Sequence, residues 1–172
     1  METVDRPFFM IYDPVHIFKN IRNNWQGEKT QTINFQDNEG RIKSASWADL
    51  IALYKTEEPF DLKNSKLTKA SVYPNNVEKQ KVSLVNNVFC ERTVAALKIS
   101  SVSNSSFLDT AEFLEQVLQL WKLWSCRSIR ERFRHNDTDR VPIAMDAHGE
   151  RGMAVLKRWA DKAVQMRQKG SL

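Results

Sequence analysis

Asp13 and His16 are the residues of this sequence whose types and spacing best suit chemistry. Asp13 directly follows an apolar and aromatic run, residues 8–12, and Pro14 follows Asp13. A carboxylate held at the end of a buried strand is a candidate Mg²⁺ ligand, because hard cations take oxygen ligands. His16, three residues further on, can hydrogen-bond back to the acid or toward a phosphate. The simpler alternative is an Asp N-cap before a helix-starting proline, with His16 as a structural residue.

Two elements must position these side chains. The run 8–12 is short, continuous and aromatic, which is typical of a strand buried on both faces. From Pro14 to about Trp25, apolar residues recur at intervals of three and four, which predicts an amphipathic helix. A single strand leaves both edges uncovered, so the sheet is expected to be completed by other sequence. Five polar residues of this helix can contact a nucleic-acid backbone or form a solvated face: Lys19, Asn20, Arg22, Asn23 and Asn24.

The remaining sequence is mostly helical in pattern. Two strand-like pieces, 32–35 and 41–44, flank a turn at 37–40, and a capping box at residues 46–49 opens a helix that ends before Pro59. Three further helices are predicted from the 3.6-residue period, over residues 77–99, 107–126 and about 150–168. A serine-rich stretch, 100–106, separates the first two of them.

Composition excludes several classes of protein. The chain has 26 Lys and Arg against 21 Asp and Glu, and its net charge of +5 permits nucleic-acid or nucleotide partners. Cys90 and Cys126 are far apart and have no C-x-x-C spacing, so neither a zinc site nor a disulfide framework is indicated. No apolar run approaches the ~20 residues that a membrane-spanning helix needs, and the acidic N-terminus does not match a secretory signal.

Several segments together resemble one family. IYDPVHIFKNIRNNW resembles the D-P-x-H-L-x-K-x-x-R-N stretch of P-element-type transposases, the group that includes the THAP-domain transposase relatives. The likeness continues through WADLIALYK, SKLTKASVYPNNVEKQKVSLVNNVFCERTVAALK, DTAEFLEQVLQLWKLWSCRS and DTDRVPI. In that family a helical insertion that binds GTP interrupts an RNase H-like catalytic domain. The resemblance implies a mainly α fold, a helical insertion domain preceded by one strand and one helix of an incomplete RNase H-like α/β fold.

The resemblance also implies domains, partners and catalytic residues. Residues 1–25 would be a fragment of the RNase H-like domain, and residues 26–172 a GTP-binding insertion domain incomplete at its C-terminus. Asp13 matches the second catalytic acid and Mg²⁺ ligand, and His16 the histidine that follows it. The other acids are expected outside the chain, so the chain alone is not expected to cut DNA.

The implied partners are GTP, Mg²⁺, transposon-end DNA and a homo-oligomer or full-length transposase, and the implied location is the nucleus. The alternative function is a domesticated or truncated, non-catalytic regulator that binds DNA or a full-length transposase.

The nucleotide site cannot be a phosphate-cradling P-loop, because the G-x-x-x-x-G-K-[ST] pattern is absent. Lys81, Asn87 and Ser125 are the candidate nucleotide-binding residues, with surface residues beside the core as the alternative interpretation. Many family members carry F-D-x-x-N-S-R after the third helix, whose acid can read guanine. Here Lys122 stands at the position of that acid, which would leave guanine N–H donors unpaired at a cost of roughly 1–3 kcal/mol.

Overall fold

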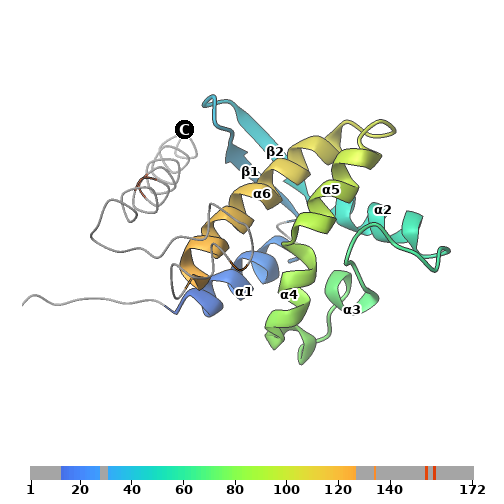
Figure 1. Ribbon diagram of the computed structural model, residues 1–172, viewed down its shortest axis with the longest axis horizontal. Helices are drawn as coiled ribbons and strands as arrows, with labels where there is room; N and C mark the ends of the chain where they lie inside the picture. The colour runs from blue at the N-terminus through green and yellow to red at the C-terminus, as the bar shows by residue number, and fades with distance from the viewer. Residues whose placement is uncertain (1–12, 28–30, 127–133, 135–153, 155–156, 158–172) are drawn as a thin grey trace, which may run out of the picture.

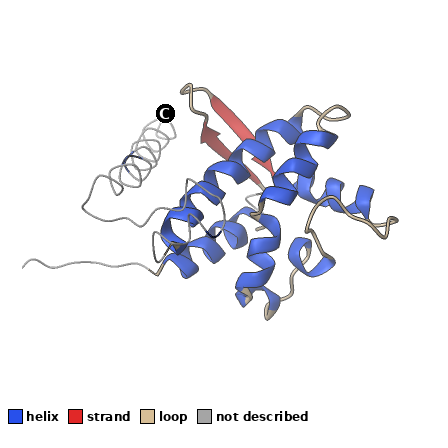
Figure 2. Cartoon of the chain, viewed as in Figure 1, coloured by secondary structure: helices blue, strands red, loops and turns tan. Residues whose placement is uncertain are grey.

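The computed structural model describes residues 13–27 and 31–126, together with the single residues 134, 154 and 157. The predicted strand at 8–12, the arginine-containing stretch 127–142 and the predicted last helix lie outside these residues, apart from three isolated positions. The body is helical, and a two-stranded antiparallel hairpin packs against α6 at one side of it (Figures 1 and 2). The elements in chain order are α1 (Pro14–Trp25), β1 (Thr32–Gln36), β2 (Ile42–Ser46), α2 (Trp47–Glu57), α3 (Lys69–Val72), the 3-10 helix η1 (Glu78–Gln80), α4 (Val82–Val88), α5 (Glu91–Ser100) and α6 (Ser106–Ser125). The prediction of a mainly helical fold is confirmed.

Aromatic side chains form the centre of the core. Trp25 of α1 is fully buried and makes edge contacts with Trp47 and Phe113, at ring-centroid distances of 5.2 and 5.0 Å. Phe18, about two turns earlier on the same side of α1, stacks on Trp121 of α6 at 4.2 Å. Such ring pairs stabilise a core beyond their buried area. Helix α1 therefore shares one hydrophobic core with the helical body, whereas the division at residue 25 into two domains stays a prediction.

The single long helix predicted over 77–99 is wrong. Phe89 and Cys90 leave the helical conformation, so that η1, α4 and α5 are separate elements. The hydroxyl of Thr93 donates to the carbonyl oxygen of Asn87 at 2.8 Å and so satisfies a group that the break exposes. The break also lets Phe89 bury its ring against Phe18, 5.1 Å away. Tertiary packing thus overrides the continuous helical period.

Helix α2 begins as predicted, but its capping box is incomplete. Ser46 is the N-cap, and its hydroxyl accepts from the N–H of Ala48 at 3.2 Å. The Asp49 carboxylate turns instead toward α6, where it accepts hydrogen bonds from the hydroxyls of Ser106 and Thr110. Asp49 is buried, so these bonds offset the cost of burying its charge and attach α2 to the start of α6.

The β1–β2 hairpin forms where the sequence predicts strands at 32–35 and 41–44, but its second strand runs two residues further, and the pairing extends from Thr32 with Ser46 to Gln36 with Ile42. Its turn is closed by Asp37, whose carboxylate accepts from the backbone N–H groups of Glu39 and Arg41 at 2.8 and 2.9 Å. Gly40 has a φ of +84°, a conformation that glycine adopts without strain. Strand β2 lies along α6, which fixes the hairpin on the helical body (Figure 1).

The Asp37 carboxylate should make stability depend on pH. Burial by itself raises the pKa of Asp37, but hydrogen bonds from the Arg41 side chain, the Arg41 backbone and the Glu39 backbone, with the Arg41 charge, lower it from 3.8 to about 2. The stabilisation is therefore fully present above pH 3.8 and is lost as the pH falls through about 2. We expect Asp37→Asn to lower the urea midpoint near neutral pH, with the difference from wild type shrinking below pH 4. A difference unchanged at pH 2 would contradict this assignment.

Candidate functional site

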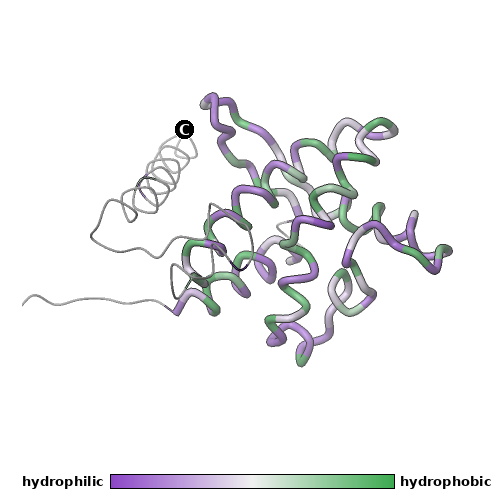
Figure 3. The backbone as a smooth tube through the Cα atoms, in the orientation of Figure 1, coloured by the Kyte–Doolittle hydropathy of each residue, from purple (hydrophilic) through white to green (hydrophobic). Residues whose placement is uncertain are grey.

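The two helices that form the site, α5 and α6, run antiparallel and are joined by a short loop at 101–105. Along both helices hydrophilic and hydrophobic residues alternate at helical intervals (Figure 3). Buried residues such as Val94, Leu97 and Leu114 hold the helices together. Their outer sides leave a groove of about 460 Å³, bounded at one side by the hairpin turn at Asn38. We call it the α5/α6 groove; it falls within the size of about 300–1,000 Å³ that is usual for ligand pockets.

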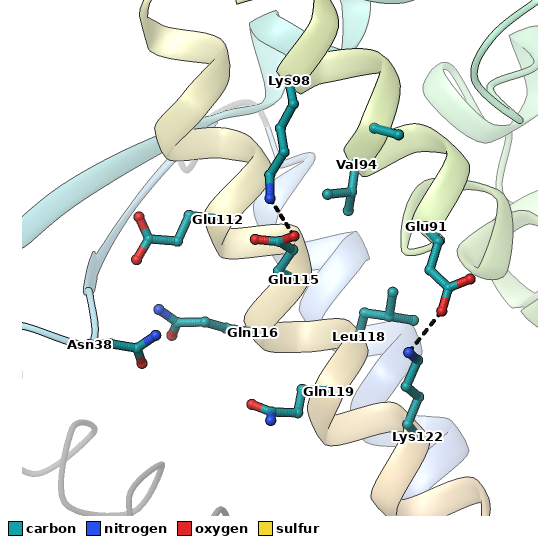
Figure 4. A pocket seen from close by; sticks show the side chains of 11 residues that line it. Asn38, Glu91, Val94, Lys98, Glu112, Glu115, Gln116, Leu118, Gln119 and Lys122 are labelled. Atoms are coloured by element: carbon teal, nitrogen blue, oxygen red, sulfur yellow. Dashed lines mark hydrogen bonds and ion pairs between the residues drawn. The ribbon is translucent and has the colours of Figure 1, made fainter. Parts of the chain in front are cut away.

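Two ion pairs cross the groove in opposite directions (Figure 4). At one end, Lys122 Nζ lies 2.8 Å from Glu91 Oε1, and at the other, Lys98 Nζ lies 2.5 Å from Glu115 Oε1. Both helices carry a glutamate followed seven residues later by a lysine. Since the helices are antiparallel, the glutamate of each faces the lysine of the other. Seven residues are about two turns, so the two pairs are roughly 10 Å apart along the helices.

An apolar floor separates the two ion pairs. Val94 and Ala95 of α5 and Leu118 of α6 line the groove between them. Polar side chains of α6 form the side toward the hairpin, where Gln116 Nε2 donates to the backbone oxygen of Gln36 at 3.2 Å. The groove therefore offers a surface for a flat ring, with both an ammonium and a carboxylate group at each end.

The hairpin side of the groove is held by Lys43. Its Nζ donates to Glu112 Oε2 at 2.6 Å and lies 3.5 Å from Asp109 and 3.8 Å from Asp37. The hydrogen bond to Glu112 raises the pKa of Lys43, and burial opposes this rise less strongly. Lys43 therefore stays charged and fixes Glu112, a lining residue, in place.

The predicted nucleotide-binding residues lie away from this groove. Lys81 is exposed at the start of α4, Asn87 is near its end, and Ser125 is the last residue of α6. None of the three lines the α5/α6 groove. Lys122 does line it, one turn before Ser125. The sequence signal that identifies the groove is the repeated Glu-to-Lys spacing of seven, which becomes informative only once α5 and α6 are known to be antiparallel.

Asp13 caps α1. Its Oδ1 accepts from the N–H of Val15 at 2.9 Å, and its Oδ2 lies 3.6 Å from Nε2 of His16, with both side chains more than half exposed. Within the described ranges, no three histidine, cysteine or acidic residues are grouped so that they could hold a metal ion. One exposed carboxylate does not make a Mg²⁺ site, which needs several oxygen ligands. The N-cap function of Asp13 is observed; its catalytic role and that of His16 stay predictions.

Arg22 corrects the predicted polar face of α1. Its side chain is fully buried, and Nη2 donates to the carbonyl oxygen of Lys79 at 2.9 Å. Arg22 follows Phe18 by four residues, so both lie on the face of α1 that packs on the core. A nucleic-acid backbone cannot reach it. Asn23 also points toward Lys79, through a weaker contact of 3.4 Å.

Cys90 and Cys126 form no disulfide with each other. No helix in the described part of the chain is both long and apolar enough to cross a membrane.

The fold defines a small helical domain with a groove between two antiparallel helices. A family model described as the TNP-like, GTP-binding insertion domain matches residues 15–136, well over half of the chain. This protein therefore belongs to the family of transposase-like GTP-binding insertion domains. No curated protein and no solved structure is similar enough to count as a match.

Proposed function

We propose that this chain is the GTP-binding insertion domain of a P-element-like DNA transposase and that it binds GTP in the α5/α6 groove. The observation that carries the proposal is the coincidence of the family match with this groove. The groove holds Lys122, at the position where the resemblance places the guanine-reading acid. Lys98 provides a cation at the opposite end, roughly 10 Å away, where phosphates can bind.

The wider transposase role is part of the same proposal. The segment D-P-V-H-I-F-K-N-I-R-N supports it, because this stretch resembles the corresponding one of P-element-type transposases. It includes the capped start of α1 and residues that pack in the core. In that setting, Asp13 would supply one carboxylate of a Mg²⁺ site, His16 would assist it, and DNA would be the partner, in the nucleus. The residues around Asp13 do not form such a site by themselves, so we assign no cleavage step to this chain.

Titration of the full chain with a fluorescent GTP analogue, in the presence of magnesium, tests the nucleotide part. We expect saturable binding that Lys98→Glu weakens at least tenfold, because the change replaces a phosphate-binding cation with a second carboxylate beside Glu115. Lys55→Glu is the matched control, since it makes the same charge change on the exposed side of α2. It should leave the affinity unchanged.

Absence of saturable binding by the wild-type chain would overturn the nucleotide part of the proposal. Equal weakening by Lys98→Glu and Lys55→Glu would show that net charge, rather than the groove, governs the affinity.

A further inference from the structure

Glu91 and Lys122 form one end of the groove, and their side chains differ in exposure. The Lys122 side chain is only 13% exposed, whereas that of Glu91 is 73% exposed. Lys122 is therefore held by its surroundings, and the carboxylate of Glu91 faces solvent at the mouth of the groove (Figure 4). Only Oε1 of Glu91 is engaged by Lys122; its Oε2 has no partner among the residues that the structure describes.

The pair presents a hydrogen-bond donor next to an acceptor. The Watson–Crick edge of guanine presents the complement: O6 accepts, while N1–H and the N2 amino group beside it donate. An ammonium group can donate to O6, and both oxygens of one carboxylate can accept from N1–H and N2–H. Adenine has one amino donor and no second donor on that edge, so it cannot occupy both carboxylate oxygens. The pair thus matches guanine better than adenine.

We infer that Glu91 reads the N1–H and N2–H groups of guanine and that Lys122 donates to O6. This inference rests on the proposed function, because it needs a guanine nucleotide in the α5/α6 groove. It resolves the difficulty raised by a lysine at position 122: the acid that this position lacks is supplied from the facing helix. The apolar floor beside the pair, formed by Val94 and Leu118, gives the base ring a surface to pack on.

The same geometry orients the rest of the nucleotide. With the base edge at Glu91 and Lys122, the ribose extends along the groove toward Lys98, about two helical turns away. There the phosphates compete with Glu115 for the Lys98 ammonium group. Specificity for the base and affinity for the phosphates are therefore assigned to opposite ends of the groove, and they can be tested separately.

Competition between GTP and ITP tests the base end, because inosine lacks only the N2 amino group. A site that pairs with a polar group of its ligand rejects an analogue without that group. We expect the wild-type chain to prefer GTP over ITP by about tenfold, as one hydrogen bond to a charged group allows. Glu91→Ala should reduce the preference to within about twofold. Glu115→Ala is the matched control at the phosphate end, and it should leave the GTP-to-ITP ratio unchanged.

A second variant keeps the test independent of folding. The double exchange Glu91→Lys with Lys122→Glu retains an ion pair across the groove and moves the carboxylate to α6. It should retain a preference for GTP over ITP even if Glu91→Ala does not fold. The inference is overturned if wild-type protein binds GTP and ITP equally, or if a folded Glu91→Ala variant keeps the full preference. In both cases GTP binding itself, and with it the proposed function, would stand; loss of all binding by wild type would remove the proposed function instead.

Discussion

Replacing Trp25 with alanine should lower the free energy of unfolding by about 3–5 kcal/mol, the usual range for truncating a buried aromatic residue. The indole is fully buried and packs against Trp47, Phe113 and Phe89. Its Nε1 also donates to the carbonyl oxygen of Ala45 at 3.3 Å, so the change leaves a cavity and removes one hydrogen bond between α1 and β2. Urea denaturation followed by circular dichroism at 222 nm measures the loss without relying on tryptophan fluorescence.

Phe60→Ala is the matched control for this change, because Phe60 is 62% exposed and does not belong to the core. Its effect should stay within about 0.5 kcal/mol. A loss of less than about 1 kcal/mol for Trp25→Ala would mean that α1 is not an integral part of the core. The experiment therefore also bears on the predicted domain boundary at residue 25, since a helix that is essential to the insertion-domain core cannot be removed from it without unfolding it.

We expect two substitutions of Arg22 to differ strongly in their effect on the free energy of unfolding. Arg22→Ala is expected to cost about 2–4 kcal/mol, because it creates a cavity and leaves the carbonyl oxygen of Lys79 with only the weaker contact from Asn23. Arg22→Met should stay within about 1 kcal/mol of wild type or exceed it. Methionine keeps the packing of the aliphatic stem and removes a buried charge, and such replacements are often neutral or stabilising.

The contacts of Arg22 explain the expected difference. Burial lowers the pKa of the Arg22 guanidinium, the direction that desolvation of a cation imposes. Within the part of the chain that the structure describes, Nε and Nη1 have no hydrogen-bond partner, and Arg22 forms no ion pair. Only the bond from Nη2 to Lys79 offsets the cost of burial. We therefore expect the buried guanidinium to lower the stability of the fold.

Arg92 provides the comparison. Its guanidinium also donates to backbone oxygens, those of Lys63 and Asn64, but from an exposed position. Arg92→Met should therefore cost about 1 kcal/mol, because hydrogen bonds are lost without relief of any burial. Urea midpoints of the four proteins measure these effects. If Arg22→Met is as destabilising as Arg22→Ala, the buried guanidinium contributes favourably and this account is wrong.

Local sequence is sufficient for several elements. Asp13 and Pro14 determine where α1 begins, and the spacing of Phe18 and Trp25 determines which side of it is buried. The hairpin follows from a turn sequence between two short strand-like pieces, and α6 follows from a sustained helical period. These features depend on interactions within a few residues, so the sequence carries them directly. The resemblance to P-element-type transposases adds the family, which the family match bears out.

Tertiary structure alone decides the break after Val88, the burial of Arg22 and the groove. The period across residues 77–99 is continuous, whereas the break is stabilised by the packing of Phe89 against Phe18 and by the hydrogen bond from Thr93 to Asn87. Arg22 is a charged residue on a helix, and its burial depends on which other elements pack over it. Glu91 and Lys122 are 31 positions apart in the numbering, and they meet because α5 and α6 are antiparallel. Local rules specify an element and its apolar face, whereas contacts between distant side chains depend on how the elements pack.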